Sequence, residues 1–320
     1  MRKTVNTTKI EGRIYEHNLA IKTVQNQQSA NYGKEYISGT IDIAVDEEGL
    51  NIVQNHFTFV TPVTSKGNAN ATFTNLKKII DENKTWLTVG KDAAQMVSIS
   101  TNLDVNDFYN RNDELVSAKR NEGGFVTLIS ALNPDETKRT LFTTDMVITN
   151  TQRVEANEEK KIPEYVAVRG YIFNFRNTIL PVEFSSETPG GMDYFEGLGA
   201  TNANPVFTQV WGTVNGFKSI TTKTEESAFG EPAVRQYETN RKVWSITGAH
   251  KETYDFGGDD LTVEELTKAI QDREVYLADV KKKNDEYKAS QAASTPAPSA
   301  SAFGAATAAS NTVPAGQFNF

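Results

Sequence analysis

The sequence predicts a mainly β protein with a few helices. Apolar and polar residues alternate along most of the first 250 positions, which is the period of a strand with one buried face. Clear helical spacing occurs in two segments, one near residue 75 and a longer one after residue 260. Hydrophobic residues make up 38% and charged residues 23% of the chain, which is typical of a globular protein.

The first 155 residues are predicted to contain strands interrupted by one helix. Phe73, Leu76 and Ile79 recur at intervals of three and four, which indicates a helix over Thr72–Asn83 with Thr72 or Thr74 as its N-cap. A polar loop is expected at Asp104–Asp113. The predicted strands are Lys9–Leu19, Tyr36–Val45, Leu50–Val60, Gln95–Thr101, Glu114–Lys119, Gly124–Leu132 and Thr140–Glu155.

The order of these elements is a strand, a two-stranded hairpin, a helix and then further strands. A five-stranded Greek-key barrel of the oligonucleotide/oligosaccharide-binding (OB) type has this order, with its helix between the third and fourth strands. Residues 1–155 are therefore predicted to form an OB-like barrel with one helix, although other small β-barrels share the order.

A second β-rich block follows a charged linker at Ala156–Lys161. Asn215-Gly216 is predicted to be a tight hairpin turn. A faint repeat of Gly12-Arg13-Ile14-Tyr15 at Gly170-Tyr171-Ile172-Phe173 favours a second, related barrel over residues 156–254. A short helix or loop is expected at Pro189–Ala200. The predicted strands are Tyr165–Phe175, Ile179–Phe184, Val206–Phe217 and Phe217–Lys223, with one or two more over Ala233–Ala249.

Residues 255–288 are predicted to hold a C-terminal helix. Leu266, Ile270 and Leu277 form an apolar stripe over Thr262–Tyr287, and Asp260 or Thr262 is expected to cap the N-terminus. Packing of this helix on the second barrel is favoured over a free partner-binding helix.

Residues 289–320 contain no Asp, Glu, Lys or Arg and are mostly Ala, Ser, Thr, Pro and Asn. Such a composition buries too little apolar surface to offset the entropy of ordering, so a disordered tether is expected. Phe318 and Phe320 stand out within it and predict a small docking peptide for a partner protein. The alternative is a ragged end that contacts nothing.

Several classes of chemistry lack candidates. The chain has no cysteine, which excludes disulfides and thiolate metal sites. His17, His56 and His250 match no metal-ligand spacing, and there is no phosphate-binding glycine loop or paired carboxylate motif. We therefore expect neither an enzyme nor a cofactor or metal. The absence of a long apolar run or secretory signal predicts a cytoplasmic protein without a membrane partner.

Aromatic residues stand beside basic ones on the predicted strands and loops. Arg169, Tyr171, Phe173 and Phe175 share one face of a strand, the pattern expected where bases stack on rings and cations hold phosphates. A core position is the alternative for each ring. The candidate nucleic-acid-binding residues are Lys34, Tyr36, Phe57, Phe59, Trp86, Tyr109, Arg111, Lys119, Arg120, Arg169, Tyr171, Phe173, Phe175, Arg176, Trp211, Lys218, Arg241 and Trp244.

Taken together, this layout resembles the single-stranded-DNA-binding proteins of tailed phages. In the bacterial family, a disordered tail ends in an acidic run followed by Pro-Phe. Phe320 matches the terminal Phe, whereas Asn319 replaces Pro, and Gln317 and Asn319 replace acidic residues. The resemblance implies sequence-nonspecific binding of single-stranded DNA in replication or recombination, partner proteins recruited through the tail, and the host cytoplasm as the location if a phage encodes the chain.

The net charge of −8 runs against this interpretation, because nucleic-acid binders usually carry a basic excess. Any binding surface must therefore be local. The alternative function is a phage virion structural or assembly protein, which predicts large oligomers without DNA. A homo-oligomer is also compatible with DNA binding, and a glycan-binding or enzymatic β protein is a third class.

Overall fold

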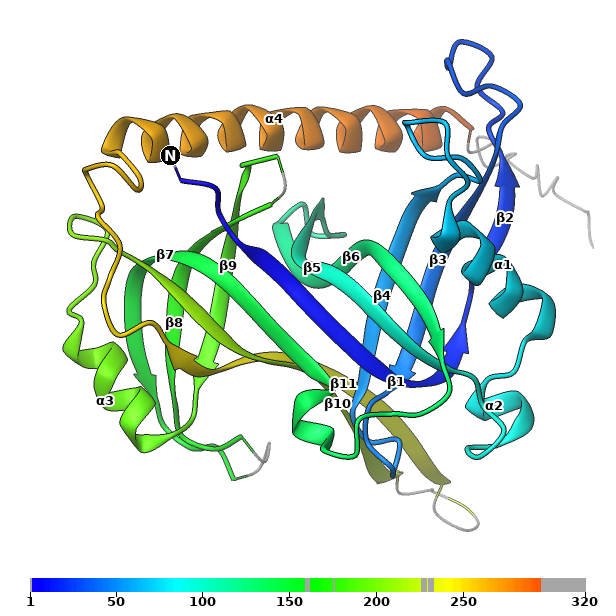
Figure 1. The fold of residues 1–320 in the computed structure, drawn as a ribbon, viewed down its shortest axis with the longest axis horizontal. Coiled ribbons are helices and arrows are strands. Elements are labelled where there is room, and N and C mark those ends of the chain that lie inside the picture. Colours follow the sequence, from blue (N-terminus) through cyan, green and yellow to red (C-terminus); the bar gives the residue numbers. More distant parts are fainter. Residues whose placement is uncertain (1, 159–161, 175, 226–228, 230–232, 295–320) are drawn as a thin grey trace, which may run out of the picture.

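The computed structural model describes residues 2–158, 162–174, 176–225, 229 and 233–294. It confirms a mainly β chain with few helices, one of them C-terminal (Figure 1). The strands are β1 Asn6–His17, β2 Ala20–Thr23, β3 Glu35–Ala44, β4 Ile52–Val60, β5 Met96–Tyr109, β6 Leu115–Ile129, β7 Thr140–Val154, β8 Tyr165–Phe173, β9 Ile179–Ser186, β10 Val206–Glu225 and β11 Ala233–Ala249. The helices are α1 Ala71–Glu82, α2 Trp86–Val89, α3 Pro189–Gly197 and α4 Val263–Ser294, with a 3-10 turn at Glu136–Lys138.

All described strands belong to one eleven-stranded sheet that closes on itself twice. The first circuit runs from β1 through β3, β4, β6 and β5 back to β1. Its pairings are antiparallel except that of β4 with β6. β2 extends the outer edge of β3, and the other pairing of β1, with β7, joins this circuit to the second one.

The second circuit repeats the same order with β7, β8, β9, β11 and β10. Here β9 and β11 form the parallel pair, at Ser185 and Ser245. A single cluster of buried apolar residues runs through both circuits, from Ile41 and Val97 to Phe184 and Val210. Because each circuit closes on itself, the strands around it have paired edges and enclose the apolar cluster.

The β5–β6 hairpin is longer than the sequence predicts. The polar loop expected at Asp104–Asp113 is wrong for most of its length, because β5 continues to Tyr109 and pairs with an uninterrupted β6. Leu103 and Val105 are buried, while the intervening Asp104 points outward and faces Arg120. Asp104 and Asn106 therefore mark the outward strand face, Asp107 lies on the buried face, and none of them breaks the strand.

The turn predicted at Asn215-Gly216 is also wrong, since β10 continues through it to Glu225. Tertiary contacts with the first circuit hold this stretch in the strand. The Gly216 amide donates to Asn51 Oδ1 at 2.8 Å, and the Lys218 amide donates to the Leu50 carbonyl at 2.8 Å. We refer to Gly216–Glu225 and Ala233–Lys242 as the β10–β11 arm, which lies against the start of β4.

Gly216→Ala is expected to lower the free energy of unfolding by about 1–3 kcal/mol, because the added methyl group would overlap the Ile52 carbonyl of β4. Urea unfolding followed by circular dichroism measures the change. Gly197→Ala in α3 is the matched control, since nothing lies within 4 Å of its added Cβ. Equal stability of the two variants would contradict the arm contact.

The caps of α1 differ in part from the prediction. Asn70 is the N-cap, and its Oδ1 accepts a hydrogen bond from the Thr72 amide at 3.1 Å. Asn83 ends the helix in the left-handed conformation at φ 44°, and it is also the last residue of the helix that the sequence predicts. The short elements α2 and β2 were not predicted.

The C-terminal helix α4 is capped by Thr262, whose Oγ1 accepts from the Glu265 amide. Figure 1 shows α4 lying across both circuits, and it contacts β5 and β9. It continues to Ser294, into the segment predicted as a tether. Residues 295–320, including Phe318 and Phe320, lie outside the described residues. Among the described helices, none is long and apolar enough to cross a membrane.

Candidate nucleic-acid interface

The outer face of β3 and β4 is polar and half-buried. Thr40 pairs with His56 and Asp42 with Gln54, so these four side chains share one face. Phe57, between His56 and Thr58, points the other way and is buried in the core. The alternation leaves a polar track along the first circuit.

Three cations from two strands, β6 and β11, lie near the place where this track reaches the second circuit. We call Lys119, Arg120 and Lys242 the basic cluster. Lys242 Nζ lies 3.3 Å from Gln54 Oε1 of β4. Lys242 and Trp244 stand two residues apart on one face of β11, and Lys119 Nζ lies 5.5 Å from the centre of the Trp244 ring. The cluster therefore bridges β4, β6 and β11.

Each cation of the basic cluster has a carboxylate in its surroundings. Arg120 Nη2 lies 3.3 Å from Asp104 Oδ2, and Arg120 Nε lies 3.4 Å from Glu122 Oε2. Burial lowers the pKa of Lys119 and of Lys242, because desolvation disfavours the charged amine. The charge of Glu183 opposes this shift at Lys119, and that of Asp42 opposes it at Lys242. An incoming anion would lower the cost of keeping both amines charged.

His56 lies on the same face, where burial and two nearby cations act on its pKa. Burial, followed by the charges of Lys242 and Arg120, lowers the pKa of His56 from 6.5 to about 4. The imidazole is therefore neutral at pH 7 in the folded chain.

Protonation of His56 is expected to destabilise the fold at acidic pH. Its pKa of about 4 lies below the value of 6.5 for an unfolded chain, so the unfolded state takes up the proton first as the pH falls. The His56 contribution to stability is constant above pH 6.5 and is lost between 6.5 and about 4. NMR titration of the imidazole measures its pKa. Lys242→Gln should raise that pKa, and an unchanged value would contradict the assigned field.

The far end of the polar track carries an aromatic pair. The Tyr36 and Phe59 ring centres lie 4.6 Å apart, and 44% of Phe59 is exposed. Phe59 is three residues beyond His56 along β4, which corresponds to about 10 Å of strand. Phe59 and the exposed Lys34 both line a hollow in the surface at this end. Exposed rings next to cations suit base stacking and phosphate contact.

Three predicted stacking residues are corrected by the structure. Phe57, Phe173 and Trp244 are buried, so no base can reach their faces. The predicted face of Arg169, Tyr171 and Phe173 packs in part under the start of α4, with Leu261 and Leu266 in the same apolar cluster. Arg169 itself pairs with Glu183 at 2.7 Å. Phe175 lies outside the described residues.

Other predicted residues occupy separate positions. Trp86 and Lys218 both approach Tyr15, whose ring centre lies 6.0 Å from that of Trp86 and 5.5 Å from Lys218 Nζ. Arg241 lies over Phe217, and Lys281 of α4 lies over Tyr109. Three further predicted residues are exposed and do not belong to the basic cluster: Arg111, Arg176 and Trp211.

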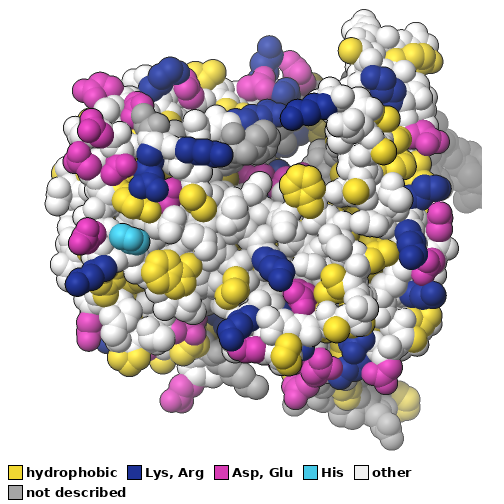
Figure 2. Space-filling model, in the orientation of Figure 1, with side chains coloured by type: hydrophobic (Ala, Val, Ile, Leu, Met, Phe, Trp, Pro, Cys, Tyr) yellow, Lys and Arg dark blue, Asp and Glu magenta, His cyan; other side chains and the backbone are white. Residues whose placement is uncertain are grey.

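Sequence reasoning did not select Gln54, His56 or Lys242 as site residues. Lys242 does stand near Trp244 in the pattern of basic and aromatic residues, but no local pattern links it to Gln54, because their contact joins segments 188 residues apart. The described residues contain no group of three or more side chains placed to hold a metal ion. Figure 2 shows Lys and Arg interspersed with Asp and Glu over one face of the molecule, so negative charge does not cover that face uniformly.

Comparison with known proteins places the chain in a family. No curated protein matches it. Among solved structures, a deletion mutant of the single-stranded DNA binding protein from Thermus aquaticus is similar with a TM-score of 0.44 and 8% identity, over 80% of this chain and 98% of that one. The YorF family matches residues 4–283, which is most of the described structure. The chain belongs to the YorF family.

Proposed function

We propose that this protein binds single-stranded DNA without sequence preference, along the outer face of β3 and β4. The observation that carries the proposal is Lys242 beside Gln54 at one end of this face, with Lys119 over the neighbouring Trp244, and the Tyr36–Phe59 pair at the other end. The cations would hold phosphates and the rings would stack on bases. No chemical step is involved.

The strand order supports the same assignment. In each circuit the parallel pair joins the third and fifth strands, and a helix, α1 or α3, lies between the third and fourth. This is the OB order, so we infer two OB-like barrels over residues 1–155 and 156–254, followed by the helical segment 255–288 and the segment 289–320. OB barrels bind oligonucleotides on their second and third strands, which here are β3 and β4.

An acidic protein can bind a polyanion where its positive charge is concentrated. Phosphate contacts release counterions from DNA, and this gain is local to the cations that touch the strand. Each stacked base adds about 1–3 kcal/mol without reading sequence. The net charge of −8 then limits binding elsewhere on the surface.

Fluorescence anisotropy with labelled oligo-dT over a salt series tests the proposal. Contacts from the three clustered cations are expected to give a slope of log affinity against log salt of about −2, at about −0.7 per phosphate. Double-stranded DNA of the same length should bind more weakly. No binding at low salt would refute the proposal, and large DNA-free oligomers in light scattering would favour a structural protein instead.

We further propose a role in replication or recombination in which residues 289–320 recruit partner proteins, as in the resemblance to phage single-stranded-DNA-binding proteins. A chain ending at Ser294 should then keep its affinity for oligo-dT and lose only its protein partners. Loss of DNA affinity in that variant would contradict this division.

A further inference from the structure

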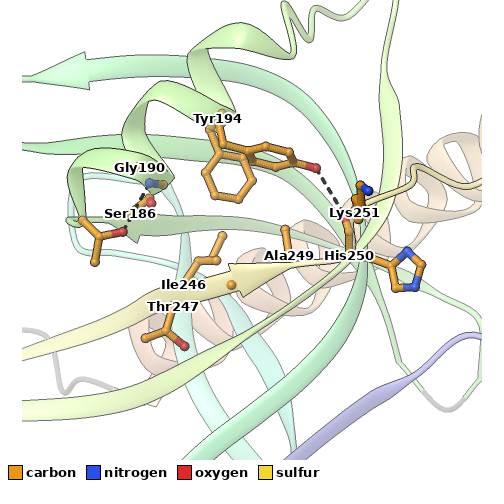
Figure 3. A pocket seen from close by; sticks show the side chains of 12 residues that line it. Ser186, Gly190, Tyr194, Ile246, Thr247, Ala249, His250 and Lys251 are labelled. Carbon is orange, nitrogen blue, oxygen red and sulfur yellow. Dashed lines mark hydrogen bonds between the residues drawn. The ribbon is translucent and has the colours of Figure 1, made fainter.

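A pocket of about 360 Å³ lies in the second circuit between α3 and the end of β11 (Figure 3). None of its lining residues belongs to the basic cluster or to the outer face of β3 and β4. Its lining includes Ser186, Gly190, Tyr194, Ile246, Ala249 and Lys251. Its volume is at the small end for ligand sites.

The N-terminus of α3 opens into this pocket. Thr188 is the N-cap, and its side chain accepts a hydrogen bond from the Gly191 amide at 3.3 Å. Nothing lies within 4 Å of the position that a Cβ on Gly190 would take, so the backbone there is open to the pocket. The first turn contains no acidic residue. Pro189 has no N–H and the Gly191 amide bonds its cap, so the Gly190 amide and the helix dipole are what favour an anion at this end.

Ser186 provides an independent indication of a ligand. Its side chain is 1% exposed, and its Oγ has no hydrogen-bond partner among the described residues. A Cβ on Gly191 would collide with this oxygen, so the hydroxyl lies directly against the first turn of α3. A buried hydroxyl without a partner costs about 1–3 kcal/mol, and an acceptor in the pocket would remove that cost.

The charges and the walls of the pocket define its ligand further. No Asp or Glu lines it, while His250 and Lys251 do. The opposite wall is apolar, with Ile246 and Ala249 beside the Tyr194 ring, as Figure 3 shows. The Tyr194 hydroxyl donates to the His250 carbonyl at 3.3 Å, which fixes the ring. An anionic group and a flat apolar body are therefore both accommodated.

We propose that this pocket binds a phosphate ester of about mononucleotide size. Its phosphate lies at the N-terminus of α3 against Ser186, and its body lies on Tyr194 and Ile246. A free nucleotide and the 5′-phosphate of a DNA strand present the same chemistry. The choice of a nucleotide rests on the proposed function, but the pocket can be tested without any DNA strand.

Calorimetry on the full chain with thymidine monophosphate and thymidine tests the pocket. Thymidine should bind at least about tenfold more weakly, because it lacks the charged acceptor. Ser186→Ala and Gly190→Ala should each weaken the monophosphate about tenfold, the first by removing a donor and the second by placing a methyl group in the pocket. Gly197→Ala, at the other end of α3, is the matched control and should bind as the parent does.

Both pocket variants are expected to fold. Ser186→Ala removes an unpartnered buried hydroxyl, and Gly190→Ala meets no neighbouring atom and improves helix propensity. Equal binding of thymidine and its monophosphate, or unchanged monophosphate binding by both variants, would overturn the proposal. Loss of monophosphate binding in a Lys119→Gln/Lys242→Gln variant would also overturn it, by locating the ligand at the basic cluster.

Two oligonucleotides separate the sources of the phosphate. If strand ends are the ligand, 5′-phosphorylated oligo-dT binds more tightly than its 5′-hydroxyl form, and Ser186→Ala removes only this difference. If both forms bind equally while the monophosphate binds in the pocket, the ligand is a free nucleotide. The monophosphate is measured without DNA. The test of the pocket therefore holds even if the protein does not bind single-stranded DNA.

Discussion

Arg273→Ala is expected to lower the free energy of unfolding by about 3–5 kcal/mol. Arg273 is only 7% exposed, and its Nη2 donates to Asp107 Oδ1 at 2.7 Å. Removing the guanidinium leaves the carboxylate of Asp107 buried, with the hydroxyl of Ser117 as a remaining donor. An uncompensated buried charge costs far more than the pair contributes while intact.

The same side chain also connects the two circuits. Arg273 Nη1 lies 3.4 Å from the Ile179 carbonyl of β9, while Asp107 belongs to β5. Farther along α4, Lys281 and Lys288 both reach Asp113 at the tip of the β5–β6 hairpin. Those exposed pairs contribute little each, since solvent screens them. Arg273 is thus expected to be the main polar link that holds α4 across both circuits.

Urea unfolding followed by circular dichroism measures the loss. Lys268→Ala is the matched control, because it removes an exposed ion pair with Asp272 on the same helix. We expect the control to change stability by less than about 1 kcal/mol. Asp107→Asn in the Arg273→Ala background should recover part of the loss by removing the orphaned charge. A loss below about 1 kcal/mol in Arg273→Ala would contradict this role.

Strand positions could be predicted where alternation has a clear buried face. The segment Tyr36–Val45 agrees with β3 to within one residue, and Ala233–Ala249 agrees with β11. Prediction failed at Asp104–Asp113 and at Asn215-Gly216, where polar or turn-forming residues lie in strands. In both places another segment supplies the partner: Arg120 of the next strand pairs with Asp104, and Asn51, just before β4, accepts from the Gly216 amide. Local propensity contains no information about such partners.

The candidate site was predictable to a similar extent. Four of the residues selected from the sequence lie on the proposed DNA-binding face or in the adjoining basic cluster: Tyr36, Phe59, Lys119 and Arg120. Phe173 shows why the selection failed elsewhere: its strand face alternates as an exposed one would, but a helix 90 residues later covers it. Whether an aromatic face is solvated depends on that later packing. The sequence pattern of β8 alone could not decide it.

Lys119→Gln/Lys242→Gln is expected to weaken binding to oligo-dT about a hundredfold at low salt, because each amine would lose a charge-assisted phosphate contact. The slope of log affinity against log salt should become shallower by about 1.4, which is two contacts at about 0.7 each. Anisotropy with the same labelled strand measures both quantities. The two substitutions keep hydrogen-bonding capacity and remove only charge.

Stability is not expected to explain this loss. Burial already lowers the pKa of both lysines, so a neutral amide at either position removes a desolvated charge. Lys77→Gln/Lys78→Gln on α1 is the matched control, with the same change in net charge and two exposed ion pairs lost. If DNA binding depended on net charge alone, both double variants would weaken equally. A loss confined to the Lys119/Lys242 variant, with unchanged unfolding in urea, would instead assign the binding energy to the place where β6 and β11 meet.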